Sequence, residues 1–163
     1  MKNLLIGFEG DTNSSKLLLD EITSDFNKIY LINDKLRSVR QVVDVLETED
    51  IAFILALGQK PVIKDKICLE LQGINNNIIY KTKYPLDDIL NFFNGKYDIM
   101  LSKRAGTSYC NNLYFNTLKY IEDKGLKTKT LFIHIPMLKN ISDFYILKDV
   151  IEKYLYSSSL FNS

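Results

Sequence analysis

An almost wholly apolar run, Ile51-Ala52-Phe53-Ile54-Leu55-Ala56-Leu57, is the feature that most constrains how this chain folds. It follows Asp50 and ends in Gly58-Gln59, so it has the length of one strand. Apolar residues without polar alternation are typical of a strand that is covered on both faces. Such strands occur in sheets with helices on both sides, and the run therefore predicts an α/β fold.

The rest of the chain alternates between apolar runs of strand length and segments of helical periodicity. We expect one domain over residues 1–163, folded as a three-layer α/β/α sandwich with a mostly parallel sheet, of the phosphorylase/hydrolase-like kind. The other expected strands are Asn3–Glu9, Lys28–Asn33, Ile67–Leu71, Asp98–Ser102 and Thr130–Ile135. The expected helices begin at Ser14 or Ser15 (and include Phe26), Asp34, Pro85, Tyr109, and Ser142 or Asp143. Gly73–Asn77 is expected to form a turn, and the Ser-rich tail 157–163 to be frayed.

Composition narrows the function classes. The 163 residues carry a formal net charge of +1 and no basic run, which gives no electrostatic basis for nucleic-acid binding. No apolar run has the length of a membrane span, and none resembles a signal peptide, so we expect a cytoplasmic protein without membrane contact. Two cysteines and one histidine leave little room for a metal site, and no cofactor is expected.

Thiol chemistry is possible between Ala105 and Pro136. Cys110 follows a loop and begins a helix, where backbone N–H groups and the helix dipole lower the pKa of a thiol. His134, the only histidine, lies near the end of a strand and would be the base. Alternatively, Cys110 is a small buried apolar residue and His134 a core histidine, and spacing alone favours this second interpretation.

The loop Gly10–Lys16 is a candidate phosphate-binding loop, because it connects a strand to a helix and ends in lysine. A nucleotide loop needs a glycine before the lysine and a hydroxyl after it, but Ser15 and Leu17 occupy these positions. Nucleotide binding is therefore the weakest functional hypothesis.

Several segments together resemble the pyroglutamyl peptidase I family of cysteine peptidases. In that family the nucleophile follows Ala-Gly-Thr-Tyr and precedes Asn, and the catalytic histidine lies in Phe-Ile-His-Val-Pro. The matching segments here are Ala105-Gly106-Thr107-x-x-Cys110-Asn111, Phe132-Ile133-His134-Ile135-Pro136, Leu55-Ala56-Leu57-Gly58-Gln59, Tyr80-x-Thr82-x-x-Pro85 and Leu5-Ile6-Gly7-Phe8-Glu9. The resemblance follows the chain in order over nearly its whole length.

The resemblance implies roles for individual residues. Cys110 would be the nucleophile and His134 the base. Ile67-Cys68-Leu69-Glu70-Leu71-Gln72-Gly73-Ile74-Asn75 matches the family stretch that carries the third catalytic residue, which would be Glu70, with Asp65 a weaker alternative. Phe8 and Gln59 would contact the substrate, a peptide with N-terminal pyroglutamate. The family commonly forms homo-oligomers, and its chemistry uses neither metal nor cofactor.

The chain also departs from the family pattern. It is shorter than a usual member, and a second phenylalanine of the substrate pocket is missing. The loop after Asn75 lacks the family's arginine, and Lys60-Pro61-Val62 replaces Gly-Gly-Arg. The alternative is therefore a catalytically altered or inactive member that binds a small ligand or a partner.

Overall fold

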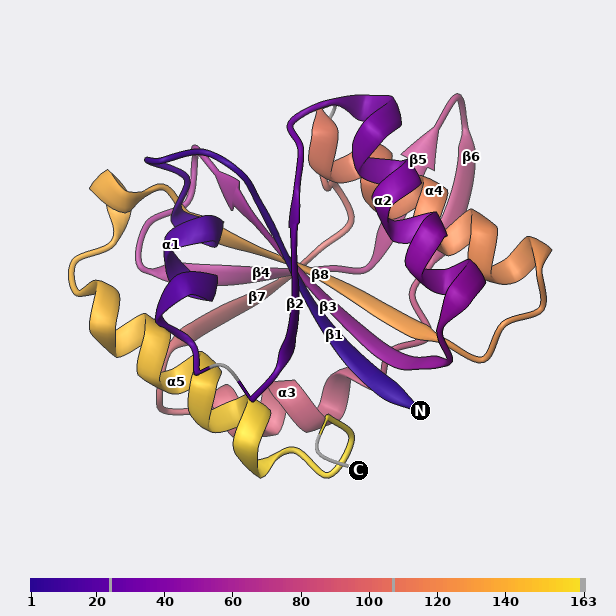
Figure 1. Cartoon of the computed structure of the whole chain (residues 1–163). Helices are drawn as coiled ribbons and strands as arrows, with labels where there is room; N and C mark the ends of the chain where they lie inside the picture. The colour runs from indigo at the N-terminus through magenta and orange to yellow at the C-terminus, as the bar shows by residue number, and fades with distance from the viewer. Residues whose placement is uncertain (24, 107, 162–163) are drawn as a thin grey trace.

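A six-stranded sheet forms the centre of the molecule (Figure 1). The computed structural model describes residues 1–23, 25–106 and 108–161. The strand order is β2-β1-β3-β8-β4-β7, and every pair is parallel except β4 with β8. The strands are β1 (Lys2–Phe8), β2 (Asn27–Leu31), β3 (Ile51–Lys60), β4 (Lys66–Glu70), β7 (Asp98–Ser102) and β8 (Lys129–Pro136). The predicted mostly parallel sheet is confirmed.

Helices cover both faces of the sheet and complete the three layers (Figure 1). Helices α1 (Ser14–Glu21), α3 (Leu86–Phe93) and α5 (Phe144–Ser157) pack on one face. Helices α2 (Lys35–Thr48) and α4 (Tyr109–Asp123) pack on the other, which we call the α4 face. A short 3-10 helix, η1 (Leu138–Asn140), precedes α5. No helix in the described part of the chain is long and apolar enough to span a membrane.

Strand β3 has the double burial that its apolar run predicts. Leu55 and Leu57 belong to the core under α1, α3 and α5, whereas Ile54 and Ala56 belong to the core on the α4 face. All four side chains are at most 2% exposed. The strand order makes β3 and β8 the two central strands of the sheet.

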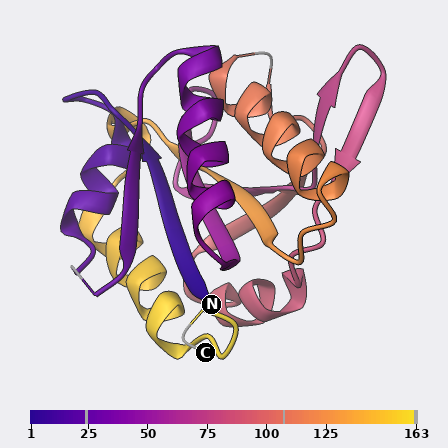
Figure 2. The ribbon, with the colours of Figure 1, turned by 45° about the vertical axis from the view of Figure 1, so that its right-hand side comes forward.

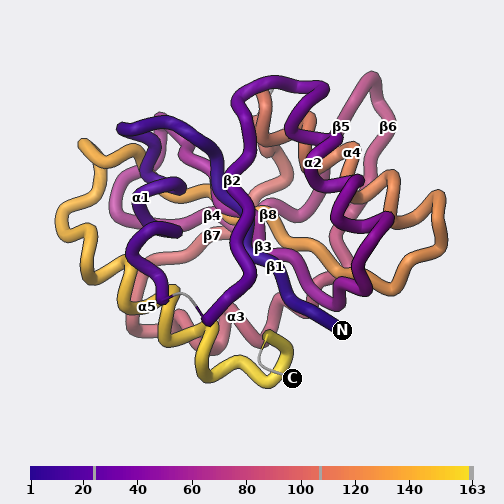
Figure 3. The backbone as a smooth tube through the Cα atoms, in the orientation of Figure 1, coloured from indigo at the N-terminus to yellow at the C-terminus, as the bar shows by residue number. Residues whose placement is uncertain are grey.

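The segment after β4 differs from the prediction. Residues 73–75, expected as part of a turn, belong to strand β5 (Gln72–Asn75), which pairs with β6 (Ile78–Lys81) in a separate hairpin. Asn76 and Asn77 both have positive φ, 48° and 68°, which is the conformation of a two-residue type I′ hairpin turn. The hairpin projects beyond the sheet beside α4, as the ribbon in Figure 2 and the tube in Figure 3 both show.

Two further predictions were wrong at element ends. Helix α1 ends at Glu21, and Phe26 lies outside it, packed against Tyr156 and Phe161. The tail is not frayed over residues 158–161, because Ser158 and Phe161 are buried, and the carbonyl of Phe161 accepts a hydrogen bond from Asn3 Nδ2. The contact joins residue 161 to strand β1, while residues 162–163 of the predicted tail lie outside the described residues.

Candidate active site

A buried contact between His134 and Glu70 forms the centre of the candidate site. His134 Nδ1 lies 2.7 Å from Glu70 Oε2. His134 is 3% exposed and Glu70 is fully buried. The contact joins residues 64 positions apart in the sequence, on adjacent strands β8 and β4.

The register of the antiparallel β4–β8 pair explains the contact. Glu70 lies opposite Phe132, and His134 follows Phe132 by two residues, so all three side chains leave the same face of the sheet. Diagonal neighbours of this kind are within reach of long side chains. The ring of Phe132 packs against the imidazole at a centroid distance of 4.9 Å. Phe132 belongs to the core under α4, so this is the α4 face.

The charge of Glu70 fixes the role of each imidazole nitrogen. Burial opposes ionisation of Glu70, but His134, Ser102 and Lys60 together outweigh it, and the pKa of Glu70 is lowered. An ionised carboxylate only accepts hydrogen bonds, so Nδ1 of His134 is the donor. Nε2 of the neutral ring then carries the free lone pair that a general base needs.

Gly58 makes room for Cys110 beside this pair. Gly58 is the register partner of His134 on β3. A Cβ atom added to Gly58 would lie 2.7 Å from Cys110 Sγ and 2.7 Å from Cζ of Phe132. The sulfur therefore packs on the α4 face, next to the ring that contacts His134.

Helix α4 carries Cys110, and contacts with β4 and β5 hold the helix in place. Asn111 accepts a hydrogen bond from Ile74 N at 3.0 Å and donates one to Ile74 O at 2.8 Å. A Cβ atom on Gly73 would lie 2.6 Å from the backbone of Phe115, so glycine permits the helix to approach β5. Tyr114 donates a hydrogen bond of 2.7 Å to the carbonyl of Glu70. These contacts fix the start of α4, and with it Cys110, relative to Glu70.

The thiol of Cys110 is not the activated group that its helix position predicts. Burial and the nearby Glu70 charge raise its pKa to about 12, although Lys60 acts in the opposite direction. Among the described residues, Cys110 Sγ makes no hydrogen bond to His134. The prediction of a lowered thiol pKa was therefore wrong for this arrangement, because desolvation and the Glu70 charge outweigh the effect of Lys60.

Lys60, a residue that the sequence motifs do not single out, connects the loop that enters α4 to the buried pair. Lys60 Nζ lies 3.3 Å from Glu70 Oε2 and 3.0 Å from the carbonyl oxygen of Arg104. Gly106 in the same loop has a φ of +93°, a conformation that favours glycine. Thr107 of the recognised motif lies outside the described residues. The sequence feature that could have indicated Lys60 is its position directly after Gly58-Gln59.

The two residues predicted to contact substrate, Phe8 and Gln59, lie on opposite faces of the sheet. Phe8 lies on the α4 face but is only 2% exposed, and its ring packs against Phe132 at a centroid distance of 6.4 Å. Gln59 follows Gly58, so its side chain leaves the opposite face, where Oε1 accepts hydrogen bonds from Ser14. Neither residue forms an open wall beside Cys110 in this arrangement.

The competing candidates have other structural partners. Both carboxylate oxygens of Asp65 accept hydrogen bonds from Ser142, so Asp65 is not brought to His134. In the loop Gly10–Lys16, Asn13 caps α1 and Lys16 forms an ion pair with Asp20 at 2.9 Å. Within the described ranges, no group of three or more His, Cys, Asp or Glu residues is arranged to hold a metal ion.

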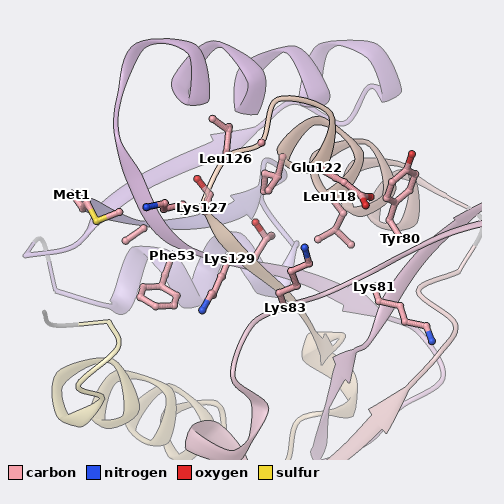
Figure 4. Close-up of a pocket in the computed structure, with 15 residues that line it drawn as sticks. Met1, Phe53, Tyr80, Lys81, Lys83, Leu118, Glu122, Leu126, Lys127 and Lys129 are labelled. Carbon is pink, nitrogen blue, oxygen red and sulfur yellow. The ribbon is translucent and has the colours of Figure 1, made fainter.

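A large cavity of about 1140 Å³ lies elsewhere on the molecule (Figure 4). Phe53 and Thr130, which line it, are close to the first residues of β3 and β8, whereas Gly58 and His134 are close to the last. The cavity is therefore at the opposite end of these strands from Cys110. Other lining residues shown in Figure 4 include Met1, Tyr80, Lys83, Leu118 and Leu126.

Comparisons with known proteins found similarity in sequence and in fold. No family model matches the chain. A pyrrolidone-carboxylate peptidase of Brachyspira hyodysenteriae is 25% identical over 204 aligned residues, covering 99% of this chain and all of the relative.

Solved structures of pyrrolidone carboxyl peptidases share the fold. A mutant of the Pyrococcus furiosus protein superposes with a TM-score of 0.80 at 15% identity, covering 96% of this chain and 97% of that one. The protein from Fervidobacterium islandicum also superposes at 0.80, with 19% identity and coverage of 95% and 96%. Sequence similarity along the whole chain and the shared fold thus confirm the predicted resemblance to the pyroglutamyl peptidase I family.

Proposed function

We propose that this protein is a cysteine peptidase that removes an N-terminal pyroglutamyl residue from peptides, with Cys110, His134 and Glu70 as its catalytic residues. The observation that carries the proposal is the buried contact of 2.7 Å between His134 Nδ1 and Glu70 Oε2. It orients a neutral imidazole on the face of the sheet that also receives the sulfur of Cys110.

The reaction starts from a neutral thiol. As Sγ of Cys110 attacks the carbonyl carbon of the pyroglutamyl residue, Nε2 of His134 takes the thiol proton. Glu70 stabilises the imidazolium that results. Ser108 makes no side-chain capping bond, so first-turn amides of α4 are available to stabilise the oxyanion.

The second half of the reaction restores the enzyme. The carbon–nitrogen bond breaks and the imidazolium gives its proton to the leaving amine. Water then attacks the thioester with His134 as base, and pyroglutamate leaves as Cys110 regains its proton. This sequence uses the chain's own groups at each step.

A binding protein without peptidase activity is the second candidate. The raised pKa of Cys110 and the burial of Phe8 favour it, because both describe a site that is not open for reaction. The two candidates differ in whether binding of a pyroglutamyl peptide brings the thiol to His134.

Hydrolysis of a fluorogenic pyroglutamyl amide separates the candidates. The proposal expects release of the fluorophore by the wild-type protein, loss of release in Cys110→Ala, and retention in Cys68→Ala, which removes the other free cysteine. Absence of release by a folded wild-type protein across pH 6 to 9 would refute the peptidase. In that case, protection of Cys110 from iodoacetamide by free pyroglutamate would identify the binding protein.

A further inference from the structure

Lys60 touches both the buried carboxylate and the loop before Cys110. Its ammonium contacts Glu70 Oε2 at 3.3 Å, the same oxygen that contacts His134, and donates to the Arg104 carbonyl at 3.0 Å. The Lys60 side chain is 21% exposed, whereas Glu70 is fully buried. The cation therefore lies between solvent and the buried pair.

The charge balance of the site depends on this cation. With a thiol and a neutral imidazole, the charges of Glu70 and Lys60 cancel. Transfer of the proton from Cys110 to His134 adds one negative and one positive charge, so the total is again zero. Without Lys60, both states would contain one uncompensated buried negative charge, which is unfavourable in a low-dielectric interior.

We propose that Lys60 is a positioning residue of this site, one that holds Glu70 as an anion and fixes the loop that leads into α4. The role of Lys60 in the peptidase reaction rests on the proposed function. The effect of Lys60 on the Cys110 thiol does not depend on that function. The charged groups that act on Cys110 are Glu70 from β4 and Lys60 from β3, and they act in opposite directions. Lys60 is thus the group that limits repulsion between Glu70 and a forming thiolate.

The test combines a chemical and a catalytic measurement on Lys60→Met and Lys60→Arg. Lys103→Met is the matched control, because Lys103 is exposed on the same loop as Arg104. The first measurement is the rate at which iodoacetamide labels Cys110 between pH 7 and 10, followed by peptide mass spectrometry so that Cys68 is counted separately. The second is kcat/KM for the fluorogenic pyroglutamyl amide.

Lys60→Met is expected to label about tenfold more slowly at each pH, the change for about one pKa unit of the thiol. Its kcat/KM is expected to fall about tenfold to a hundredfold, the range for loss of a hydrogen bond to a charged group. Lys60→Arg keeps the charge and stays close to wild type in both measurements. Lys103→Met changes neither.

The two measurements separate this inference from the proposed function. Equal labelling rates in Lys60→Met and Lys103→Met would overturn the inference, even if the wild type is an active peptidase. An inactive wild type whose Cys110 labelling still slows in Lys60→Met would refute the peptidase and retain the role of Lys60. If Lys60→Met does not give a cooperative melting transition, Lys60→Gln replaces it as a neutral variant that still donates to the Arg104 carbonyl.

Discussion

Replacement of Gly58 by alanine tests the placement of Cys110 most directly. The added methyl group would meet Cys110 Sγ at 2.7 Å and the Phe132 ring at 2.7 Å and 2.9 Å. Phe132 is fully buried, with Phe8 and Tyr114 packed around its ring, so the ring has little space in which to move. The substitution must therefore displace the sulfur, the ring or both.

The expected cost follows from overpacking a buried site. Extra methyl groups in filled cores destabilise by about 1–3 kcal/mol. For a domain of this size each kcal/mol lowers Tm by about 2–4 °C. Activity should fall further than stability, because a displacement of about 1 Å at a reacting atom reduces the rate by about a hundredfold.

Urea unfolding and the fluorogenic assay measure both effects, and Cys110→Ala provides the second arm of a double-mutant cycle. Removing Sγ eliminates one of the two groups that the added methyl group would meet. Gly58→Ala should therefore lower the unfolding free energy less in the Cys110→Ala background than in the wild type. Additive unfolding free energies within about 0.5 kcal/mol, or a Gly58→Ala protein with wild-type stability and activity, would refute the placement of the sulfur against Gly58.

Three further changes have defined outcomes. Glu70→Gln should reduce kcat by about two orders of magnitude or more, and Glu70→Asp tests whether a carboxylate alone suffices. The lowered pKa of Glu70 also means that the carboxylate stabilises the fold above the ordinary glutamate range, near pH 4–5. That stability is lost as pH falls through the lowered pKa. In urea unfolding, the difference in unfolding free energy between wild type and Glu70→Gln should therefore shrink on acidification. A difference that stays constant with pH would contradict the lowered pKa. Asn111→Ala removes both bonds to Ile74 and should cost about 1–3 kcal/mol, with faster amide exchange in the β5–β6 hairpin than in Asn112→Ala. Phe161→Ala should destabilise the fold by about 3 kcal/mol. An unchanged Tm would support the prediction that the tail is frayed.

Local patterns in the sequence predicted most of the elements. The buried run at β3, the cap at Asp34 and the stop at Gly125 are short-range signals, and the corresponding elements have the expected types. The β5–β6 hairpin was missed because Asn76 and Asn77 form its turn without glycine, and the flanking strands have only four residues each. The buried tail was missed because burial of Phe161 depends on Phe26, which is far away in the sequence.

Residue types and order determined that Cys110, His134 and Glu70 were the candidates, because the matching motifs are contiguous in the sequence. The antiparallel direction of β4 against β8 decided that Glu70 lies diagonally across from His134 on the face under α4. Only the tertiary structure could also show that Cys110 is half-buried against the core on the α4 face and that Lys60 reaches the carboxylate. Strand direction, burial and charge proximity depend on segments far apart in the chain, and no local pattern of residues encodes them.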